Sequence, residues 1–134
     1  MPDGYAIKNI DEMEAIFGGG FKLARAELGV EAFGLQVIDL PPNVGDNYPE
    51  HDHSEDGQEE VYVPISGSGE IQIDGEAHAL SPGLIVRVGP GVKRQLRTGN
   101  QALRVLAIGG VPGQAYEISE GTKLGTPDPL AQQS

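Results

Sequence analysis

Two histidines one residue apart precede a strand-like run that opens with two glutamates, in the segment HDHSEDGQEEVYVPISG at residues 51–67. Alternate side chains of an extended chain point the same way, so His51 and His53 share a face. Only one of Glu59 and Glu60 can face the side on which the histidines lie. Two imidazoles and one carboxylate on adjacent strands can fill three positions on one side of a metal ion. That arrangement suits Fe(II), with Mn, Ni, Co or Zn as further candidates.

The same segment also fits an acidic hairpin that faces water, because its remaining charged residues are of types that rarely lie buried. These residues are Glu50, Asp52, Glu55 and Asp56. An isolated His-x-His pair favours this second interpretation. The spacing to a strand glutamate and to a following turn glycine makes the metal-site interpretation as well supported as the acidic hairpin.

The composition narrows the class of protein that could carry such a site. A chain of 134 residues predicts one domain, and its 20 glycines and 10 prolines between short apolar runs favour an all-β architecture. The formal net charge of −11 argues against binding to nucleic acid or to an anionic membrane. The chain has no cysteine, so a metal would be held by histidine, carboxylate or backbone oxygen. Because the sequence shows neither a long apolar run nor a basic-then-apolar leader, we expect a cytoplasmic protein.

Short strands are the elements that would position the site. The period of two that starts at Phe33 predicts a first strand, which ends before Pro41. Asp74 and Gly75 predict a tight hairpin turn. Further strands are expected at residues 59–66, 69–73, 76–80, 84–88, 92–98, 102–109 and 115–118. Many short antiparallel strands in one small domain indicate a sandwich, a jelly roll or a closed barrel.

The chain divides into three parts around these strands. Residues 1–32 form a lead-in, in which apolar spacings of three and four predict a helix over residues 9–17 with Asn9 as its cap. Residues 33–118 form the barrel. Residues 119–134 have little to bury and two Xaa-Pro bonds, so we expect a tail that is mobile or lies over a neighbouring surface.

The segment GDNYPEHDHSEDGQEEVYVPISG resembles the first conserved motif of the cupins. That motif runs glycine, five residues, His-x-His, a few residues, glutamate, six residues, glycine. Gly45, His51, His53, Glu60 and Gly67 occupy these places, with a slightly long gap between the second histidine and the glutamate. The six-residue spacing to the last glycine favours this glutamate over its neighbour. The resemblance therefore implies a metal held by His51, His53 and Glu60.

The second cupin motif is matched less well by LSPGLIVRVGPGVKRQLRTGN at residues 80–100. Pro90 and Gly91 fit its Pro-Gly turn. Arg94 stands where a metal-binding cupin carries its third histidine, and Thr98 stands where an asparagine is usual. An arginine stays protonated and has no acceptor, so it cannot ligate a metal.

Arg94 thus either turns away from a metal, holds an anion beside it, or marks a site without metal. If the alignment holds, the guanidinium points into the barrel and needs a carboxylate partner, which could be Glu60 or the carboxylate of a ligand. Tyr62 would share the cavity and offer a hydroxyl, so Arg94 and Tyr62 are the expected substrate-binding residues. The alternative is that Arg94, with Lys93 and Arg97, only balances a very acidic surface.

The resemblance implies an all-β, double-stranded β-helix of jelly-roll type with a short N-terminal helix, a small-molecule cavity at the barrel mouth, and homodimers that cover open strand edges. Two functions follow from it. One is a metal-dependent enzyme of the oxygenase, isomerase or decarboxylase class that acts on a small, anionic organic substrate. The other is a non-catalytic binding or sensing module with no catalytic metal. His78, in the run EAHAL, is expected to be a surface histidine rather than a ligand.

Overall fold

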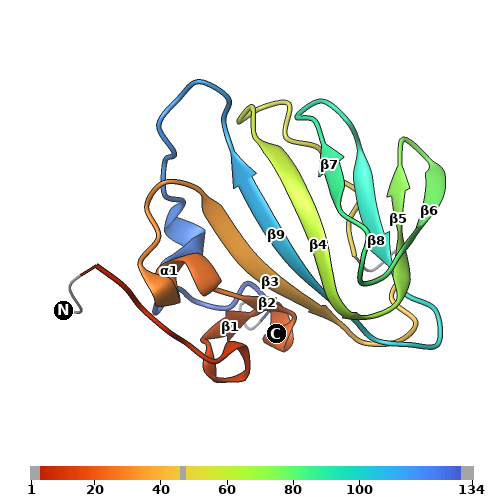
Figure 1. Ribbon diagram of the computed structural model, residues 1–134, viewed down its shortest axis with the longest axis horizontal. Coiled ribbons are helices and arrows are strands. Elements are labelled where there is room, and N and C mark those ends of the chain that lie inside the picture. Colours follow the sequence, from red (N-terminus) through yellow and green to blue (C-terminus); the bar gives the residue numbers. More distant parts are fainter. Residues whose placement is uncertain (1–3, 46–47, 131–134) are drawn as a thin grey trace.

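The computed structural model describes residues 4–45 and 48–130, and it consists of two antiparallel sheets packed face to face (Figure 1). The larger sheet has the order β1 (Ala15–Ile16), β2 (Phe21–Lys22), β3 (Gly34–Leu40), β9 (Leu103–Gly110), β4 (Glu59–Gly67) and β7 (Val86–Val88). The smaller sheet has the order β6 (Glu76–Leu80), β5 (Gly69–Ile73) and β8 (Arg94–Arg97). The chain crosses from the larger to the smaller sheet after β4 and after β7, and returns after β6 and after β8, so the predicted all-β jelly roll is confirmed.

The apolar core lies between the two sheets. Along β9, buried and half-buried residues alternate at all eight positions, because one face of the strand packs inward. Ile71, Leu80 and Leu96 of the smaller sheet are 0% exposed, and they belong to the same cluster as Leu103 and Val105 of β9. Burial of each such side chain stabilises the fold by about 1.5–3 kcal/mol. This packing fixes β4 and β8, the strands that carry Glu60 and Arg94, within one rigid barrel.

Two glycines allow the chain to turn where the strands require it. Gly67 has a φ of 80°, and a Cβ at this position would lie 1.9 Å from the carbonyl oxygen of Ala102, so the last glycine of the first motif lets the strand pass another backbone. Asp74 and Gly75 have φ angles of 50° and 85°. Positive φ at both central residues is typical of a type I′ hairpin turn, as the sequence predicts.

The helix predicted over residues 9–17 is wrong. Only η1 (Ile10–Glu12) forms there, as a single 3₁₀ turn whose Asn9 side chain accepts a hydrogen bond from the Asp11 N–H at 2.9 Å. The cap is therefore where the sequence places it, but the helix does not continue. Ala15–Ile16 pairs with β2 instead, and this pairing leaves Ile16 only 4% exposed. Burial in the sheet outweighs the weak tendency of so short a segment to be helical.

The other elements of the flanks are also short. The turn between β1 and β2 contains η2 (Phe17–Gly19), and α1 (Ala24–Leu28) follows β2. The expected strand at residues 115–118 does not form, and that stretch leads as coil into η3 (Glu120–Thr122). Within the part of the chain described here, no helix is long and apolar enough to cross a bilayer.

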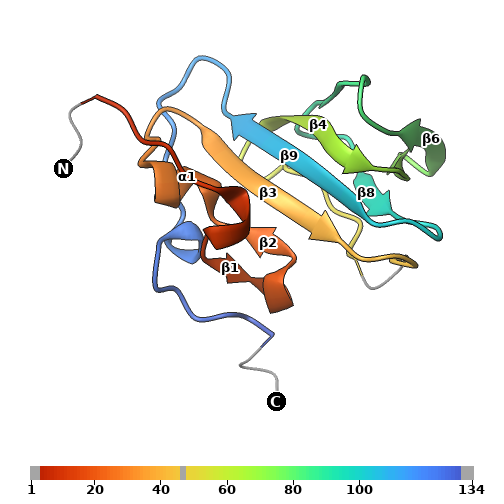
Figure 2. The same ribbon diagram turned by 60° about the horizontal axis from the view of Figure 1, so that its bottom comes forward.

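The C-terminal segment lies against the β1–β2 hairpin, below the barrel in Figure 2. The Asp128 carboxylate accepts hydrogen bonds from the N–H groups of Phe17 and Gly18, each at 2.9 Å. The N–H of Gly125 donates to the Glu14 carboxylate at 2.6 Å. Of the tail predicted at residues 119–134, the part up to residue 130 thus has specific contacts with the rest of the chain, and residues 131–134 lie outside the described residues.

Candidate metal and ligand site

The two histidines lie on an extended segment that runs beside β8. The backbones of His51 and Arg94 form an antiparallel bridge, with hydrogen bonds of 3.0 and 2.8 Å in the two directions. The N–H of His53 donates to the Pro90 carbonyl at 2.7 Å. These bonds hold the segment extended, so both imidazoles fall on one side, with their ring centroids 5.3 Å apart.

Glu60 of β4 faces the histidines from the opposite sheet. One ligand atom from each of His51, His53 and Glu60 can be chosen so that all three lie within 4.8 Å of one another. Within this group, His53 Nε2 lies 3.1 Å from Glu60 Oε1. Glu59 points to the other face and pairs with Arg87 at 3.0 Å. The spacing argument therefore selected the glutamate that the fold brings to the histidines.

Neighbouring groups orient each imidazole. His51 Nδ1 lies 3.3 Å from the Pro49 carbonyl oxygen, which can only accept, so Nδ1 carries the proton and Nε2 is left as the donor atom for a metal. His53 Nδ1 lies 3.1 Å from both carboxylate oxygens of Asp56. A carboxylate behind a metal-binding histidine fixes the ring and raises its basicity. This hydrogen bonding matches what metal-ligating histidines require.

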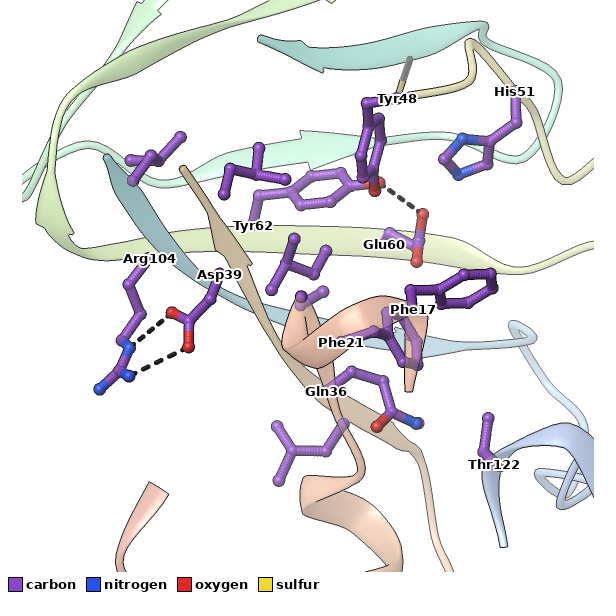
Figure 3. A pocket seen from close by; sticks show the side chains of 18 of the residues that line it. Phe17, Phe21, Gln36, Asp39, Tyr48, His51, Glu60, Tyr62, Arg104 and Thr122 are labelled. Carbon is purple, nitrogen blue, oxygen red and sulfur yellow. Dashed lines mark hydrogen bonds and ion pairs between the residues drawn. The ribbon is translucent and has the colours of Figure 1, made fainter. Parts of the chain in front are cut away.

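The Glu60 carboxylate is held by three groups at once. The Tyr62 hydroxyl donates to Glu60 Oε1 at 2.7 Å, and Arg94 Nη1 lies 3.8 Å from the same oxygen (Figure 3 shows the tyrosine contact). Burial acts to raise the pKa of Glu60. The hydrogen bonds from His53 and Tyr62, with the charge of Arg94, outweigh it, so the pKa lies below the usual range. The carboxylate is therefore ionised and ready to bind a cation.

The charge on Glu60 also affects the groups around it. Its hydrogen bond is the main reason that the pKa of His53 is raised above 6.5. Burial, with the charge of Glu60, raises the pKa of Tyr62 well above its usual value and that of Tyr48 to about 12. Both phenols therefore stay protonated and can act only as neutral hydroxyl groups at physiological pH.

Arg94 is completely buried, with an exposure of 0%. Its Nη2 donates to the carbonyl oxygens of Val88 at 3.4 Å and Gly89 at 3.0 Å, while Nε and Nη1 find no hydrogen-bond partner among the described residues. The alternative in which this arginine only balances surface charge is therefore wrong. Within the described chain, Arg94 is not among the residues that line the cavity. Its charge therefore affects the site by way of the ion pair with Glu60. Direct contact between Arg94 and a substrate stays a prediction.

His78 lies apart from this cluster. It is on the edge strand β6, its side chain is 48% exposed, and its nearest charged neighbour is Glu76 at 3.8 Å. It has the surface position that the sequence favours for it.

A large cavity of about 1180 Å³ opens beside the His-His-Glu group. Tyr48 and Tyr62 form its wall next to Glu60, and Phe17 and Phe21 lie on the other side of the carboxylate in Figure 3. Its apolar lining includes Phe17, Phe21, Ile38, Leu40, Leu103 and Leu130. The sequence did not indicate that the phenylalanines and the C-terminal residues line a cavity, because Phe17 fits a helical spacing and the others belong to no motif. The only sequence feature that could have indicated this part of the lining was an apolar residue beside the three glycines at 18–20.

The architecture and the site define a class: a jelly-roll protein with two histidines and a glutamate that could hold a metal ion at the mouth of a cavity. Residues 37–109, more than half of the chain, match the family described as the Cupin domain, so the chain belongs to the cupin family. A comparison with curated proteins finds no match.

Solved structures support the fold. A cupin protein from Bacteroides fragilis has 24% identity and a TM-score of 0.68 over 88% of this chain and 93% of its own. A predicted oxalate decarboxylase from Thermotoga maritima has 24% identity and a TM-score of 0.51 over 60% of this chain and 68% of its own. The cupin domain of an XRE family transcriptional regulator from Enterobacter cloacae has 27% identity and a TM-score of 0.52 over 63% and 86%.

Proposed function

We propose that this cupin is a metal-dependent enzyme that acts on a small, anionic organic substrate by an oxygenase, isomerase or decarboxylase type of reaction. The observation that carries the proposal is the convergence of His51, His53 and Glu60 beside a large cavity. This donor set suits Fe(II), Mn, Ni, Co or Zn, and three protein ligands leave open positions for water and substrate. A bound ion would supply a Lewis acid that polarises a substrate oxygen.

The residues around the donor set have roles that follow from their contacts. Asp56 holds the His53 ring, and Tyr62 and Arg94 hold one oxygen of Glu60, so the donor atoms need little rearrangement to bind an ion. The buried positive charge of Arg94 offsets the negative charge of the Glu60 carboxylate. An anionic substrate group beside the ion would thus meet less electrostatic repulsion than the net negative charge of the whole chain would suggest. The walls around Tyr48 would keep water from the reacting group.

A second candidate function is a binding or sensing module without a catalytic metal. It is favoured by one observation: Glu60 already has a counter-charge in Arg94, and a second one in His53 whenever that imidazole is protonated. The solved cupins do not decide between the two functions, since they include a predicted decarboxylase and a domain of a transcriptional regulator.

The homodimer also stays a proposal. The edge strand β6, with its first four residues exposed, is the edge that a second copy could cover.

Metal content tests the proposal directly. Protein purified without a histidine tag or added metal is expected to contain about one transition-metal ion per chain by elemental analysis. His51→Ala should lose most of this metal and keep its far-ultraviolet circular dichroism, because the half-buried imidazole supports no core packing. His78→Ala, which removes an exposed histidine outside the cluster, is the matched control and should keep its metal. Unchanged metal in the His51 variant would refute the ligand assignment.

The metal affinity should depend on pH. The hydrogen bond with Glu60 raises the pKa of His53, so a proton competes with the metal for this imidazole already above 6.5. We expect the affinity to fall as the pH is lowered through neutrality, by up to about tenfold per pH unit for each histidine that must lose a proton. Metal titrations between pH 8 and pH 5 measure this slope. An affinity that stays flat over this range contradicts ligation by the histidines.

A further inference from the structure

The cavity is much larger than the space around the metal ligands. At about 1180 Å³ it exceeds the ~300–1,000 Å³ typical of pockets for drug-sized ligands. A substrate of two or three carbons would fill only the part beside Glu60. The remaining volume extends from Glu60 toward the β1–β2 hairpin, on the side of the carboxylate away from Tyr48 and Tyr62, where Phe17 and Phe21 line it (Figure 3).

Most of the lining of this remaining volume is apolar, and its two largest polar side chains near the hairpin already have partners. Arg104 at the rim donates to both oxygens of Asp39, at 2.7 and 3.0 Å, and to Asp11 at 2.6 Å. The buried Gln36 side chain, with its amide nitrogen toward the backbone, donates to the carbonyl oxygens of Leu35 and Lys22 at 2.9 Å each. Since Arg104 and Gln36 need no ligand and most of the surrounding side chains are apolar, this part of the cavity is suited to hydrocarbon.

The aromatic end of the cavity is built by contacts between distant parts of the chain. The rings of Phe17 and Phe21 pack edge to face with centroids 5.9 Å apart. Phe17 has a φ of 55°, a conformation that residues other than glycine rarely adopt. The two hydrogen bonds from its N–H and that of Gly18 to Asp128 hold the turn in this conformation. Strain of this kind persists only where the surrounding structure enforces it, and Phe17 in this conformation lines the cavity.

From these observations, and resting on the function proposed above, we propose that the substrate is amphipathic. Its polar oxygen end would lie at His51, His53 and Glu60, and an extended apolar part would occupy the cavity toward Phe17 and Phe21. Short, wholly polar acids would leave most of the cavity unfilled and would bind weakly, because burial of apolar surface provides most of the affinity such a lining can give.

Two homologous probe series test this inference. Straight-chain alkanoic acids from butanoate to decanoate are titrated into the metal-loaded protein, and straight-chain alkanols from butanol to decanol are titrated into metal-free His51→Ala. We expect the dissociation constant to fall about three- to fourfold with each added methylene in both series, until the cavity is filled. The alkanols need no metal, so they report on the apolar part alone.

Two substitutions locate the bound chain. Ala107→Phe places a ring into the cavity from β9 and should weaken the longest probes at least tenfold while it leaves butanol binding nearly unchanged. Ile65→Ala alters an exposed apolar residue of β4 outside the cavity lining and should change neither series. Affinity independent of chain length in both series would overturn the amphipathic assignment even if metal binds. Chain-length dependence of the alkanols in a protein that never binds metal would instead overturn the metal-dependent function and leave the apolar site standing.

Discussion

Replacing Glu60 by leucine is expected to lower the free energy of unfolding of the metal-free protein by about 3–5 kcal/mol. Arg94 is 0% exposed, and its only charged partner among the described residues is Glu60, at 3.8 Å. Glu60→Leu leaves this guanidinium buried without a counter-charge, and it also removes the acceptor of the Tyr62 hydroxyl. Urea unfolding in the presence of a chelator measures the loss.

Two further variants separate this effect from a general sensitivity of β4. Glu59→Leu changes the adjacent residue, whose partner Arg87 is 69% exposed, and should cost no more than about 1 kcal/mol. The double variant Glu60→Leu with Arg94→Leu replaces the whole pair by apolar side chains and should recover most of the lost free energy of unfolding. Replacing both partners of a buried ion pair by apolar side chains often costs no stability, because no unpaired charge is left buried. If Glu60→Leu is no more harmful than Glu59→Leu, or if the double variant recovers nothing, Arg94 does not depend on Glu60.

The parts of the fold that the sequence predicts are those in which local chemistry and tertiary contacts agree. Strands β5 and β6 were predicted with their observed bounds, because Asp74-Gly75 permits only a tight turn between two alternating runs. The choice of Glu60 over Glu59 came from a spacing to Gly67, and that spacing has a physical basis. The glycine is needed where β4 leaves the sheet, and because a register shift between Pro64 and Ser66 interrupts the two-residue period, the full spacing of the motif and not alternation alone indicates the glutamate.

The helix at residues 9–17 and the cavity wall could not be predicted in the same way. The apolar residues of positions 9–17 fit a helical period, but the end of this stretch, Ala15–Ile16, is used to extend the large sheet. Phe17 meets Asp128 across 111 positions of sequence. No local pattern encodes such a contact, which depends on where the finished barrel leaves an open edge. The terminal segments thus determine the size of the cavity, while the motifs determine only its polar end.

The burial of Arg94 gives this cupin a different charge balance from a site with a third histidine. The resemblance correctly implied that this position faces the barrel interior, but it left open whether the arginine meets a ligand or Glu60. In the structure its Nη1 lies beside the Glu60 carboxylate, and its Nη2 donates to the Gly89 carbonyl oxygen. A metal bound here would share its carboxylate with a fixed cation, so we expect its affinity to be weaker than the donor set alone suggests.

Arg94→His is therefore expected to tighten metal binding about a hundredfold or more, which corresponds to roughly 2.7 kcal/mol. The backbone bridge between His51 and Arg94 is a hydrogen-bonded antiparallel pair, so side chains at the two positions lie opposite each other on one face, with Cα atoms about 5.5 Å apart. A histidine at position 94 would stand beside His51 as a fourth ligand. The substitution also removes a repulsion of roughly 5 kcal/mol, the value for a divalent ion and a unit charge ~6 Å apart at an effective dielectric of ~20.

The control for this gain is Arg97→His, which removes the same charge from the same strand. Arg97 lies on the other face of β8, where its guanidinium approaches Glu70 at 3.8 Å. Competition titrations against a chelator of known affinity, at one pH and one salt concentration, compare the two variants with the unmodified protein. Arg97→His should leave the affinity within a few-fold of the original, because its charge is partly exposed and screened. Equal gains in both variants would show that net charge sets the affinity, and no gain in Arg94→His would show that position 94 does not face the metal.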